Sequence, residues 1–590
     1  MLRTHTCNEL TETNVDQKVT LCGWVHRRRD HGGMIFIDLR DRYGLTQVAA
    51  DPTVSPEGYK ILDEARSEFV LKIEGSVRKR PEGMKNSKMT TGGIEVVVNS
   101  AEILNRSKTP PFEIDQDKEV NEELRLKYRY LDIRRERMKN NLIMRHNVIK
   151  KIRDYMDSKG FLEIETPILI KGTPEGSREY LVPSRLYPGK FFVLPQSPQQ
   201  LKQLLMVASM DRYFQIARCF RDEDQRGDRQ PEFTQLDVEM SFIEQEDIIQ
   251  LNEELMINLV ETLVPHKKIQ KKPFPRMTWQ ESMDKYGSDK PDIRFGMEIV
   301  DVSDLVKESG FKVFADAVKA GGVVRALKVE GGNKFTRKEI DELTELAQSF
   351  GAKGLAYIQI APEGPKSSLL KFFKDEEVKA LVEKTKAQSG DIIFFGAGEF
   401  LKVCEVLGKI RLACGDKMNL RDNNVFAFCW VYDFPLFEWS ATEQRLNSAH
   451  HPFTSPKDED VAMLDTAPEK VRAKAYDLAL NGNEIGGGSI RIHTPELQSK
   501  IFDTLGISKD DAQRRFGHLL HAFEFGAPPH GGIAWGIDRL IMLFQDEANI
   551  REVMAFPKDQ KAKDLMLNAP SEMPDEQIAE LHIRIDLPKK

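Results

Sequence analysis

The chain has 590 residues, which exceeds what one hydrophobic core supports, so three to four domains are expected. Hydrophobic residues make up 40% of it and charged residues 30%, and the formal net charge is -7, so any nucleic-acid binding must come from local basic patches. No apolar run reaches membrane-spanning length, the N-terminus lacks the apolar core of a secretion signal, and the six cysteines are scattered, which predicts a cytoplasmic protein that binds no membrane, with reduced thiols and without structural zinc.

Residues 18–105 contain five short segments of strand-like sequence, separated by turn signals and by one helix-like segment at residues 58–67. This pattern predicts a small Greek-key barrel of the oligonucleotide-binding (OB) kind. Arg27 to Arg29 could bind a nucleic-acid backbone, Phe36 could stack on a base and Gln47 could read a base edge. For Phe36 taken alone, a position in the core is the more common explanation.

A linker with proline and acidic residues is expected at residues 109–117. The next segment is rich in arginine and lysine and predicts a long helix that ends at Gly160. Such a helix either is solvated or follows a nucleic-acid backbone.

Beyond Gly160, FLEIETPILI predicts a strand that carries Pro167, and a turn then places the carboxylate of Glu175 at its tip. A helix is expected to follow, with Ser197 as N-cap and Pro198 at its first position. Gln199 and Lys202 share one face of that helix, although a lone lysine on a helix normally faces solvent.

The stretch from Ala217 to Phe242 predicts an antiparallel hairpin with a long polar connection. Arg221 and Glu223 project from the end of its first strand, and Arg226 and Arg229 lie in the loop. Guanidinium groups bind phosphate or carboxylate oxygens through paired donors, so this layout favours an anion site. The alternative is a surface hairpin whose ion pairs stabilise little.

Residues 287–420 change to mixed helix and strand, which indicates an inserted domain. After it, Asn481-Gly482 is a strong hairpin signal that pairs Leu480 with Asn483 and Ala479 with Glu484. Asp477 and Glu484 then lie diagonally on one face, where a shared Mg²⁺ would offset their repulsion. Three glycines, 486 to 488, would let a ligand approach the backbone. A glycine-rich bulge with solvent-facing acids is the alternative, but it leaves the carboxylate pair unexplained.

Near the C-terminus, Gly532 and Gly536 indicate close backbone packing, and residues 537–544 predict an apolar helix with Arg539 near its start. An arginine there opposes the helix dipole unless an anion binds with it. The sequence contains no Gly-x-x-x-x-Gly-Lys-Ser/Thr loop and no Gly-x-Gly-x-x-Gly turn, so the two commonest nucleotide-binding designs are excluded. The remaining arginines and carboxylates suit phosphoryl chemistry driven by charge stabilisation.

FLEIETP, CFRDED with RQPEFTQLDVE, and GIAWGIDRL resemble motifs 1, 2 and 3 of the class II aminoacyl-tRNA synthetases. With the barrel in front and SDKPDIR at the insertion, the whole chain is similar to the bacterial type of aspartyl-tRNA synthetase. The resemblance implies an α+β multidomain fold with an OB-fold barrel, an antiparallel-sheet catalytic domain and an inserted α+β domain. The expected divisions are 1–108 (anticodon-binding barrel), 109–138 (hinge), 139–287 (catalytic, first part), 288–420 (insertion), 421–560 (catalytic, second part) and 561–590 (C-terminal extension).

The resemblance also assigns site residues. It implies that Arg221, Glu484 and Arg539 are catalytic and that Asp477 and Glu484 bind Mg²⁺, which accompanies the ATP substrate. The ATP-binding residues would be Arg221, Asp222, Glu223, Gln230, Glu484, Gly536, Ile537, Asp538 and Arg539. The aspartate-binding residues would be Glu175, Gln199, Lys202, Arg221, Asp237, His450 and Arg491, with Asp237 tying down Lys202 and Arg491. Because asparagine would leave two buried cations unpaired, L-aspartate is the expected amino acid.

On the barrel, the resemblance implies that the tRNA anticodon contacts Arg29, His31, Phe36, Gln47, Gly83 and Glu95. His31 together with Gly83 resembles the pairing of non-discriminating enzymes, which charge tRNA(Asn) as well as tRNA(Asp). A homodimer is expected, and the inserted domain is similar to one in a tRNA-dependent amidotransferase subunit, to which charged tRNA(Asn) could be handed over.

Three alternatives remain open. The enzyme could be strictly specific for tRNA(Asp). Asparaginyl- and lysyl-tRNA synthetases share the barrel and the motifs, but the insertion and the pair formed by Lys202 and Arg491 argue against them. A synthetase-like nucleic-acid-binding protein without catalysis should have lost Arg221, Glu484 or Arg539, and all three are present.

Overall fold

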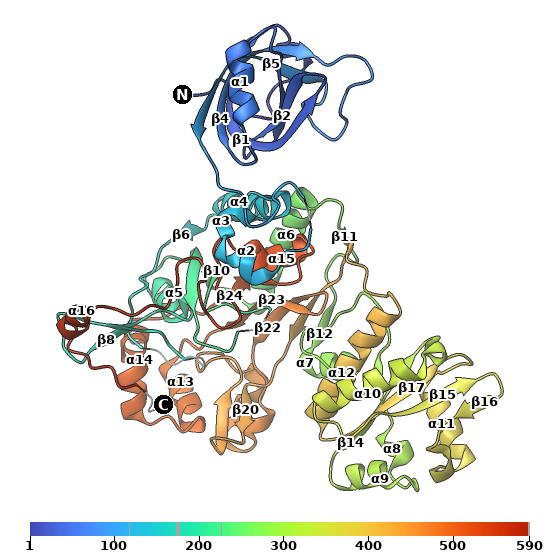
Figure 1. Ribbon diagram of the computed structural model, residues 1–590. Helices are drawn as coiled ribbons and strands as arrows, with labels where there is room; N and C mark the ends of the chain where they lie inside the picture. The colour runs from blue at the N-terminus through green and yellow to red at the C-terminus, as the bar shows by residue number, and fades with distance from the viewer. Residues whose placement is uncertain (117, 173–177, 226, 588–590) are drawn as a thin grey trace. The chain divides into compact units, whose positions relative to one another are not determined.

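The computed structural model describes residues 1–116, 118–172, 178–225 and 227–587 (Figure 1). The chain divides into two compact units. The first comprises Met1–Arg145, Gln225–Gly227 and Ala548–Glu572, and the second comprises His146–Asp224, Asp228–Glu547 and Met573–Lys590. Within the described part of the chain, no helix combines the length and the apolar character that crossing a membrane requires.

The first unit contains the predicted barrel, which closes in the strand order β1-β2-β3-β5-β4. Alternate residues of β1, such as Val19, Leu21 and Val25, are buried in its core. A Cβ on Gly23 would lie 2.5 Å from the carbonyl oxygen of Arg40, so glycine permits the close crossing of β1 and β2. The strands are β1 (Lys18–His31), β2 (Met34–Arg40), β3 (Leu45–Ala50), β4 (Val70–Lys79) and β5 (Ile94–Asn105), and α1 (Pro56–Glu64) connects β3 to β4.

The prediction of one long basic helix before Gly160 is wrong, because the segment forms α2 (Glu122–Lys127), α3 (Arg129–Asp132) and α4 (Glu136–Ser158). Arg125 and Arg129 bind the buried carboxylate of Asp132, and Arg125 also binds Glu552. Arg129 donates further hydrogen bonds to the carbonyl groups of residues 551, 554 and 555. These tertiary contacts outweigh local helix propensity, and they bury two arginines that the sequence left available to nucleic acid.

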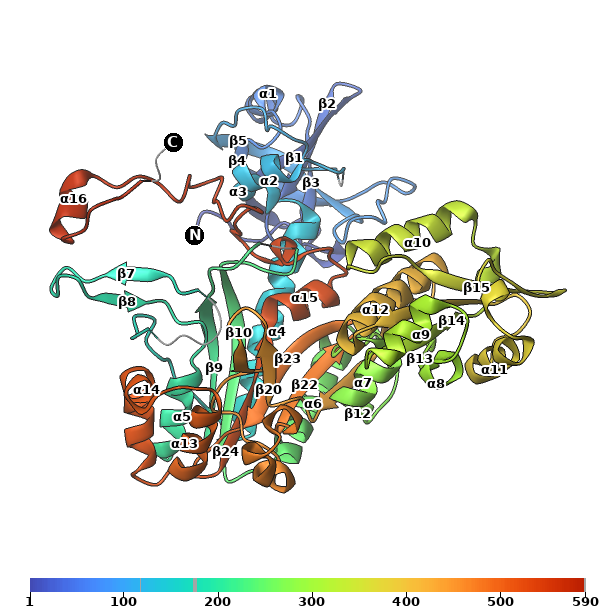
Figure 2. The same cartoon turned by 90° about the horizontal axis from the view of Figure 1, so that it is seen from below.

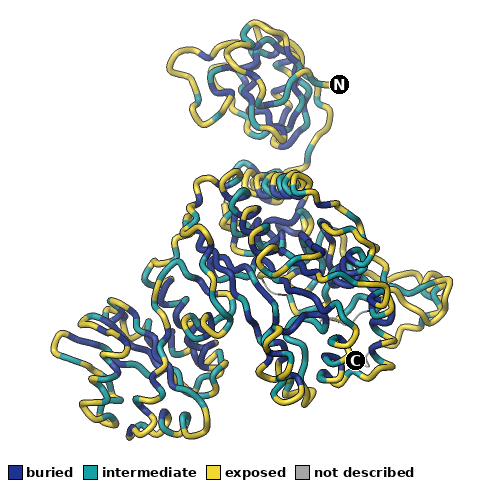
Figure 3. The backbone as a smooth tube through the Cα atoms, turned by 180° about the vertical axis from the view of Figure 1, so that it is seen from behind, coloured by how far each residue is buried: buried dark blue, intermediate teal, exposed yellow. Residues whose placement is uncertain are grey.

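The second unit is built on an eight-stranded sheet in the order β12-β19-β22-β23-β24-β10-β9-β6. Its pairs are antiparallel except β12 with β19 and β6 with β9. Figure 2 shows β9 beside β10 and β22 beside β23, and β24 joins the two pairs in the sheet. These central strands are buried along most of their length (Figure 3). The strands are β6 (Leu162–Glu163), β9 (Arg212–Phe220), β10 (Glu232–Ser241), β12 (Arg276–Thr278), β19 (Phe428–Tyr432), β22 (Ala475–Leu480), β23 (Asn483–Ile490) and β24 (His530–Gly536).

Helices and short ribbons accompany this sheet. The helices are α5 (Gln199–Val207), α6 (Gln245–Leu263), α7 (Trp279–Tyr286), α13 (Pro495–Thr504), α14 (Lys509–Phe523), α15 (Ile537–Phe544) and α16 (Asp575–Glu580). The ribbons pair β7 (Leu181–Pro183) with β8 (Phe191–Val193), β11 (Lys268–Ile269) with β18 (Val425–Phe426), and β20 (Phe437–Ser440) with β21 (Arg445–Ser448).

The predicted insertion forms its own five-stranded sheet in the order β13-β14-β17-β15-β16. Two apolar clusters pack against the sheet, one containing Leu327 and Phe394 and the other Phe314 and Phe395. Its elements are β13 (Ile299–Asp301), α8 (Ser303–Val306), α9 (Lys312–Lys319), β14 (Val323–Val329), α10 (Arg337–Ser349), β15 (Ala356–Ala361), β16 (Gly364–Lys366), α11 (Asp375–Thr385), β17 (Ile392–Gly398) and α12 (Phe400–Lys417).

Two boundaries in the second unit differ from the predictions. The strand expected to carry Pro167 is reduced to the two residues of β6, since the hydroxyl of Thr166 bonds Gln215 and proline cannot donate to a ladder. Helix α5 begins at Gln199 with Pro198 as its cap, one residue later than expected. The Ser197 hydroxyl still accepts a hydrogen bond from the Gln199 amide at 3.3 Å.

Candidate functional site

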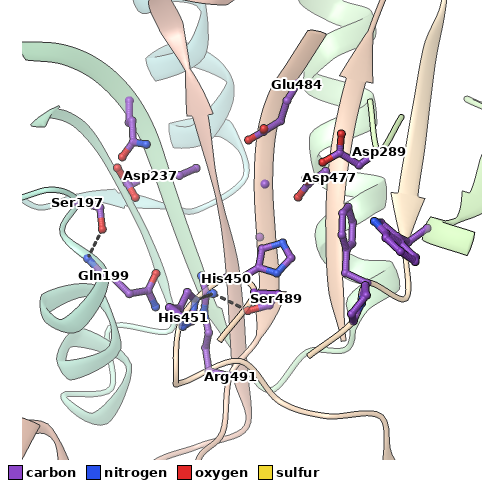
Figure 4. A pocket seen from close by; sticks show the side chains of 18 of the residues that line it. Ser197, Gln199, Asp237, Asp289, His450, His451, Asp477, Glu484, Ser489 and Arg491 are labelled. Atoms are coloured by element: carbon purple, nitrogen blue, oxygen red, sulfur yellow. Dashed lines mark hydrogen bonds between the residues drawn. The ribbon is translucent and has the colours of Figure 1, made fainter. Parts of the chain in front are cut away.

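A pocket of about 410 Å³ opens in the second unit over strands β10, β22 and β23 (Figure 4). Its lining includes most of the residues predicted to bind aspartate and Mg²⁺, namely Gln199, Lys202, Arg221, Asp237, His450, Asp477, Glu484 and Arg491. The predicted Glu175 lies outside the described residues. The convergence of cations from α5, β9 and the end of β23 agrees with an anion-binding site.

Lys202 is buried, so the expectation that this lysine faces solvent is wrong. Its side chain is 1% exposed, and its Nζ lies 3.2 Å from both Asp237 Oδ1 and Glu239 Oε2. Asp237 and Glu239 stand two residues apart on β10 and therefore point to the same face of the sheet. Burial raises the pKa of Asp237 although Lys202 opposes the change. For Glu239, Arg491 and Lys202 outweigh burial and lower the pKa.

Glu239 contacts both Lys202 and Arg491, a role that the resemblance had given to Asp237. Arg491 Nε donates to Glu239 Oε1 at 3.0 Å, while its Nη1 donates to Ser489 Oγ at 2.6 Å and to His451 Nε2 at 2.6 Å. The pKa of His451 is lowered by burial and by Arg491, so its imidazole is neutral and can accept. Both cations are thus held in fixed positions before any substrate enters.

His450, predicted near aspartate, stands edge-on to the ring of Phe434 at 5.0 Å between centroids. Burial lowers the pKa of His450, and its Nδ1 has no hydrogen-bond partner among the described residues. A buried nitrogen without a partner is costly, and His450 lines the pocket, so this atom is a candidate for a hydrogen bond with a ligand.

The hairpin formed by β22 and β23 has the predicted register next to its turn, with Leu480 opposite Asn483 and Ala479 opposite Glu484. A bulge between Leu478 and Ala479 then shifts the register, so that Asp477 lies opposite Gly487. Burial and the neighbouring Glu484 raise the pKa of Asp477, and its Oδ1 lacks a partner within the described chain. In Figure 4 the carboxylate of Asp289 lies beside Asp477.

The site fits a hard divalent cation. No group of three or more histidine, cysteine or acidic residues in the described parts of the chain is arranged to hold a metal. Two protein carboxylates, one with an unsatisfied oxygen, match Mg²⁺, which keeps waters and substrate phosphates as its other ligands.

The three glycines of β23 have different roles. A Cβ on Gly486 or Gly488 would collide with β24, coming within 2.8 Å of the Ala534 carbonyl and 2.1 Å of the Gly532 carbonyl, respectively. A Cβ on Gly487 would lie 2.5 Å from Asp477 Oδ1. Two of the glycines therefore serve strand packing, and Gly487 leaves space at the carboxylate pair, where a ligand was expected to approach.

Two of the predicted ATP residues are arginines, one of which lines the pocket. Arg221 lies in the lining with its guanidinium 5.0 Å from the ring centre of Phe233, and its Nε has no partner among the described atoms. Arg539, at the third position of α15, donates to the backbone carbonyl of Glu484 at 2.6 Å and lies 3.4 Å from Asp228 Oδ2. Arg221 therefore lines the same pocket as Asp477 and Glu484, and Arg539 lies against the backbone of Glu484.

Other predicted ATP residues have partners in this structure. Glu223 binds Arg229 at 2.6 Å, as expected for the loop between β9 and β10, whereas Arg226 lies outside the described residues. Gln230 is buried. The amide of Asp222 donates to the Arg178 carbonyl, and the Asp538 carboxylate accepts from the amide of Thr234 at 2.9 Å. Gly536 caps α15, which begins at the buried Ile537.

On the barrel, Arg29, Gln47 and Glu95 are joined by hydrogen bonds. Phe36 is partly exposed and pairs with Arg29 in the ladder, so the alternative of a core position for this residue is wrong. His31 is the exposed last residue of β1, and Gly83 has a φ of 87° with open space around it. The structure therefore brings Arg29, Gln47 and Glu95 together and leaves His31 and Gly83 on exposed segments.

Among the residues that line or support the pocket and that the sequence reasoning missed are Glu239, Asp289, His451 and Ser489. Alternation along β10 could have found Glu239, because it follows Asp237 by two residues. Asp289 belongs to the SDKPDIR segment, which was used only to mark the entrance of the insertion.

Comparisons with known proteins agree with this geometry. One family model, described as tRNA synthetases class II (D, K and N), matches residues 121–560, and another, described as OB-fold nucleic acid binding domain, matches residues 19–104. The aspartate–tRNA(Asp/Asn) ligase of Rubrobacter xylanophilus is 55% identical over 586 residues, covering 99% of this chain and 97% of the relative. The protein of the same name from Dehalococcoides mccartyi strain CBDB1 is 53% identical over 600 residues and covers 100% of both chains.

Among solved structures, asparaginyl-tRNA synthetase from Pyrococcus horikoshii complexed with asparaginyl-adenylate matches with a TM-score of 0.59 and 19% identity, covering 94% of this chain and 98% of that one. This likeness supports the fold alone. Because the first family model spans most of the sequence and the curated relatives match it over their full length, the chain belongs to the class II tRNA synthetases of the D, K and N group.

Proposed function

We propose that this protein attaches L-aspartate to tRNA(Asp) and tRNA(Asn), with ATP as the energy source and an aspartyl-adenylate as intermediate. The observation that carries the proposal is the pair of buried cations, Lys202 and Arg491, fixed by Glu239 in a pocket that also holds a carboxylate pair. Support also comes from relatives above 50% identity that are named aspartate–tRNA(Asp/Asn) ligases.

The cation pair selects the amino acid. The side-chain carboxylate of aspartate accepts hydrogen bonds from Lys202 and Arg491, whereas asparagine would bring an amide whose NH₂ group faces donors. Leaving buried donors unpaired costs far more than losing an apolar contact, so the pocket rejects asparagine strongly. At the other end of the substrate, Gln199 orients the α-amino group, and Glu175 is assigned the same role from the sequence.

The first reaction step needs no protein nucleophile. The α-carboxylate of aspartate attacks the α-phosphorus of ATP, and the bond to pyrophosphate breaks. Arg221 stabilises the charge on the α-phosphate, and Arg539 binds the outgoing phosphates. Glu223 and Gln230 hold the nucleotide. Asp477 and Glu484 would hold Mg²⁺, which supplies positive charge to the phosphate oxygens when bound.

In the second step, the 3′-hydroxyl of the terminal adenosine of tRNA attacks the activated carbonyl, and AMP leaves. His31 and Gly83 on the barrel support a relaxed choice of the third anticodon base, which distinguishes the two tRNAs. The resemblance further leads us to propose a cytoplasmic homodimer. Since aspartate on tRNA(Asn) is mismatched, a tRNA-dependent amidotransferase would have to convert it to asparagine.

Charging assays test the function directly. Purified enzyme, ATP, Mg²⁺ and radiolabelled aspartate are mixed with each tRNA separately, and aspartylation of both is expected. Charging of tRNA(Asp) alone would establish the strictly specific alternative. Absence of aspartate-dependent pyrophosphate exchange would overturn the catalytic assignment as a whole.

A further inference from the structure

Two glutamines of helix α5 and a histidine of strand β24 form one hydrogen-bonded chain beside the pocket. Gln199 Nε2 donates to Gln203 Oε1 at 3.1 Å, one helical turn away. Gln203 Nε2 lies 3.1 Å from Nε2 of His530, and Nδ1 of His530 lies 2.7 Å from the Pro528 carbonyl oxygen. Gln199, Gln203 and His530 are 6%, 0% and 0% exposed, so water cannot readily replace these bonds. The sequence reasoning gave Gln203 and His530 no role.

The carbonyl group at the end of this chain determines which atoms carry the protons. A carbonyl oxygen only accepts, so Nδ1 of His530 must donate to Pro528. Burial lowers the pKa of His530 although Glu239 opposes the change, so the ring is neutral and its Nε2 is an acceptor. The hydrogen bond between Gln203 and His530 therefore runs from the Gln203 NH₂ group to Nε2 of the ring.

The direction of that bond is passed along α5 to Gln199. Because the NH₂ group of Gln203 donates to His530, its oxygen faces Gln199 and accepts from the NH₂ group of that residue. Turning over either amide would set two acceptors against each other, which costs a buried hydrogen bond. The chain therefore favours one orientation of the Gln199 amide, in which the NH₂ group is held at Gln203 and the carbonyl oxygen stays available to a ligand.

His530 is held in place by the sheet itself. It is the first residue of β24 and pairs with Ser241 of β10. Its carbonyl oxygen accepts a hydrogen bond from the amide of Arg491 at 2.9 Å. Figure 4 shows the Gln199 side chain reaching from the start of α5 into the pocket, which it lines together with Arg491. The same backbone segment thus supports the chain of amides and the arginine proposed to bind the side-chain carboxylate.

We propose that His530 and Gln203 are positioning residues that hold the Gln199 carbonyl oxygen toward the α-ammonium group of the amino acid, so that the pocket prefers aspartate to a dicarboxylate without an amino group. The inference rests on the proposed function and adds two residues to it. An ammonium group has three donors and no acceptor, so it binds a carbonyl oxygen and is repelled by an NH₂ group. A flipped Gln199 amide would present its NH₂ group instead.

The test compares L-aspartate with succinate, which has both carboxylates but no amino group. Gln203→Met keeps the length of the side chain and removes the amide donor and acceptor. Aspartate-dependent pyrophosphate exchange gives the KM for aspartate, and inhibition of that exchange by succinate gives its Ki. We expect Gln203→Met to raise the KM for aspartate roughly tenfold and to leave the Ki of succinate within about twofold, because only aspartate uses the Gln199 oxygen.

Three further variants make the test specific. His530→Leu removes the acceptor at the other end of the chain and should give the same change as Gln203→Met. In a Gln199→Leu background, adding Gln203→Met should change the preference for aspartate no further, because both act through one amide. Asn252→Leu is the matched control, since it removes another buried amide, whose Nδ2 donates to the Ile248 carbonyl oxygen at 2.8 Å within α6. The control should keep the full preference for aspartate over succinate.

Both constants are independent of the fraction of active enzyme, so partial unfolding of a variant does not decide the outcome. Equal increases in the KM for aspartate and the Ki of succinate would overturn the proposal, because they would indicate a general loss of pocket structure. An unchanged KM for aspartate in Gln203→Met and His530→Leu, or additive effects in the double variant, would overturn it as well. Failure of the proposed function would look different, since the unmodified enzyme would then show no aspartate-dependent exchange.

Discussion

Replacing Glu239 by glutamine tests how the pocket holds its cations. Glu239 contacts Lys202 at 3.2 Å and Arg491 at 3.0 and 3.3 Å. A glutamine keeps one acceptor oxygen, so it can serve one cation, and it turns an NH₂ group toward the other. One charge-assisted hydrogen bond is lost, which is worth about 1.5–3 kcal/mol. We therefore expect kcat/KM for aspartate to fall by roughly 10- to 150-fold.

The assay is aspartate-dependent exchange of pyrophosphate into ATP, titrated in aspartate at fixed ATP and then in ATP at fixed aspartate. The KM for aspartate should rise while the KM for ATP stays unchanged, because Glu239 holds only the cations that face the amino acid. Glu254→Gln is the control, since its exposed pair with Lys159 (2.8 Å) contributes little. An unchanged KM for aspartate, or equal increases for both substrates, would refute the reasoning.

Three further outcomes are expected. Arg221→Ala should reduce adenylate formation, measured by pyrophosphate exchange, at least about a hundredfold, with tRNA binding retained, because it removes charge that the transition state needs. Gly487→Ala should raise the Mg²⁺ concentration for half-maximal exchange about tenfold, since its Cβ would displace the Asp477 carboxylate. Glu68→Gln should destabilise the first unit by about 3 kcal/mol in urea unfolding, because this buried carboxylate serves two arginines at 2.7 Å.

Each of these three expectations would be contradicted by a specific result. Normal exchange by Arg221→Ala would remove its catalytic assignment. Gly354→Ala, where a new Cβ meets open space, should leave the Mg²⁺ requirement unchanged, and an equal shift in both glycine variants would exclude a local effect. Glu74→Gln removes an exposed pair with Lys72, and destabilisation as large as that of Glu68→Gln would show that burial does not matter.

Features encoded by neighbouring residues could be predicted from the sequence. The Asn481-Gly482 turn requires a positive φ at both residues, which are 52° and 86°, and so it determined the register of the hairpin and the pairing of Ala479 with Glu484. The barrel also followed from short alternating segments and turn signals. In each case the information lies within a few residues along the chain.

Features that depend on distant partners could not be predicted this way. Lys202 looks like a surface lysine because its counter-charges lie on β10, 35 residues away along the chain in the case of Asp237. The basic segment before Gly160 looked like one helix because the Glu552 carboxylate that binds Arg125 is 427 residues away. Only the resemblance to a family placed Lys202 and Arg491 in one site before the structure did.

The hydrogen bond from Arg539 to the backbone carbonyl of Glu484 joins the residue proposed to bind the triphosphate to a residue proposed to bind the metal. The arginine assigned to the triphosphate and the residue assigned to the metal share this bond, so a guanidinium that turns toward a phosphate releases the peptide group behind the metal ligand. On these proposed assignments we expect nucleotide affinity and cation affinity to be linked, and linkage then requires each ligand to change the affinity for the other by the same factor.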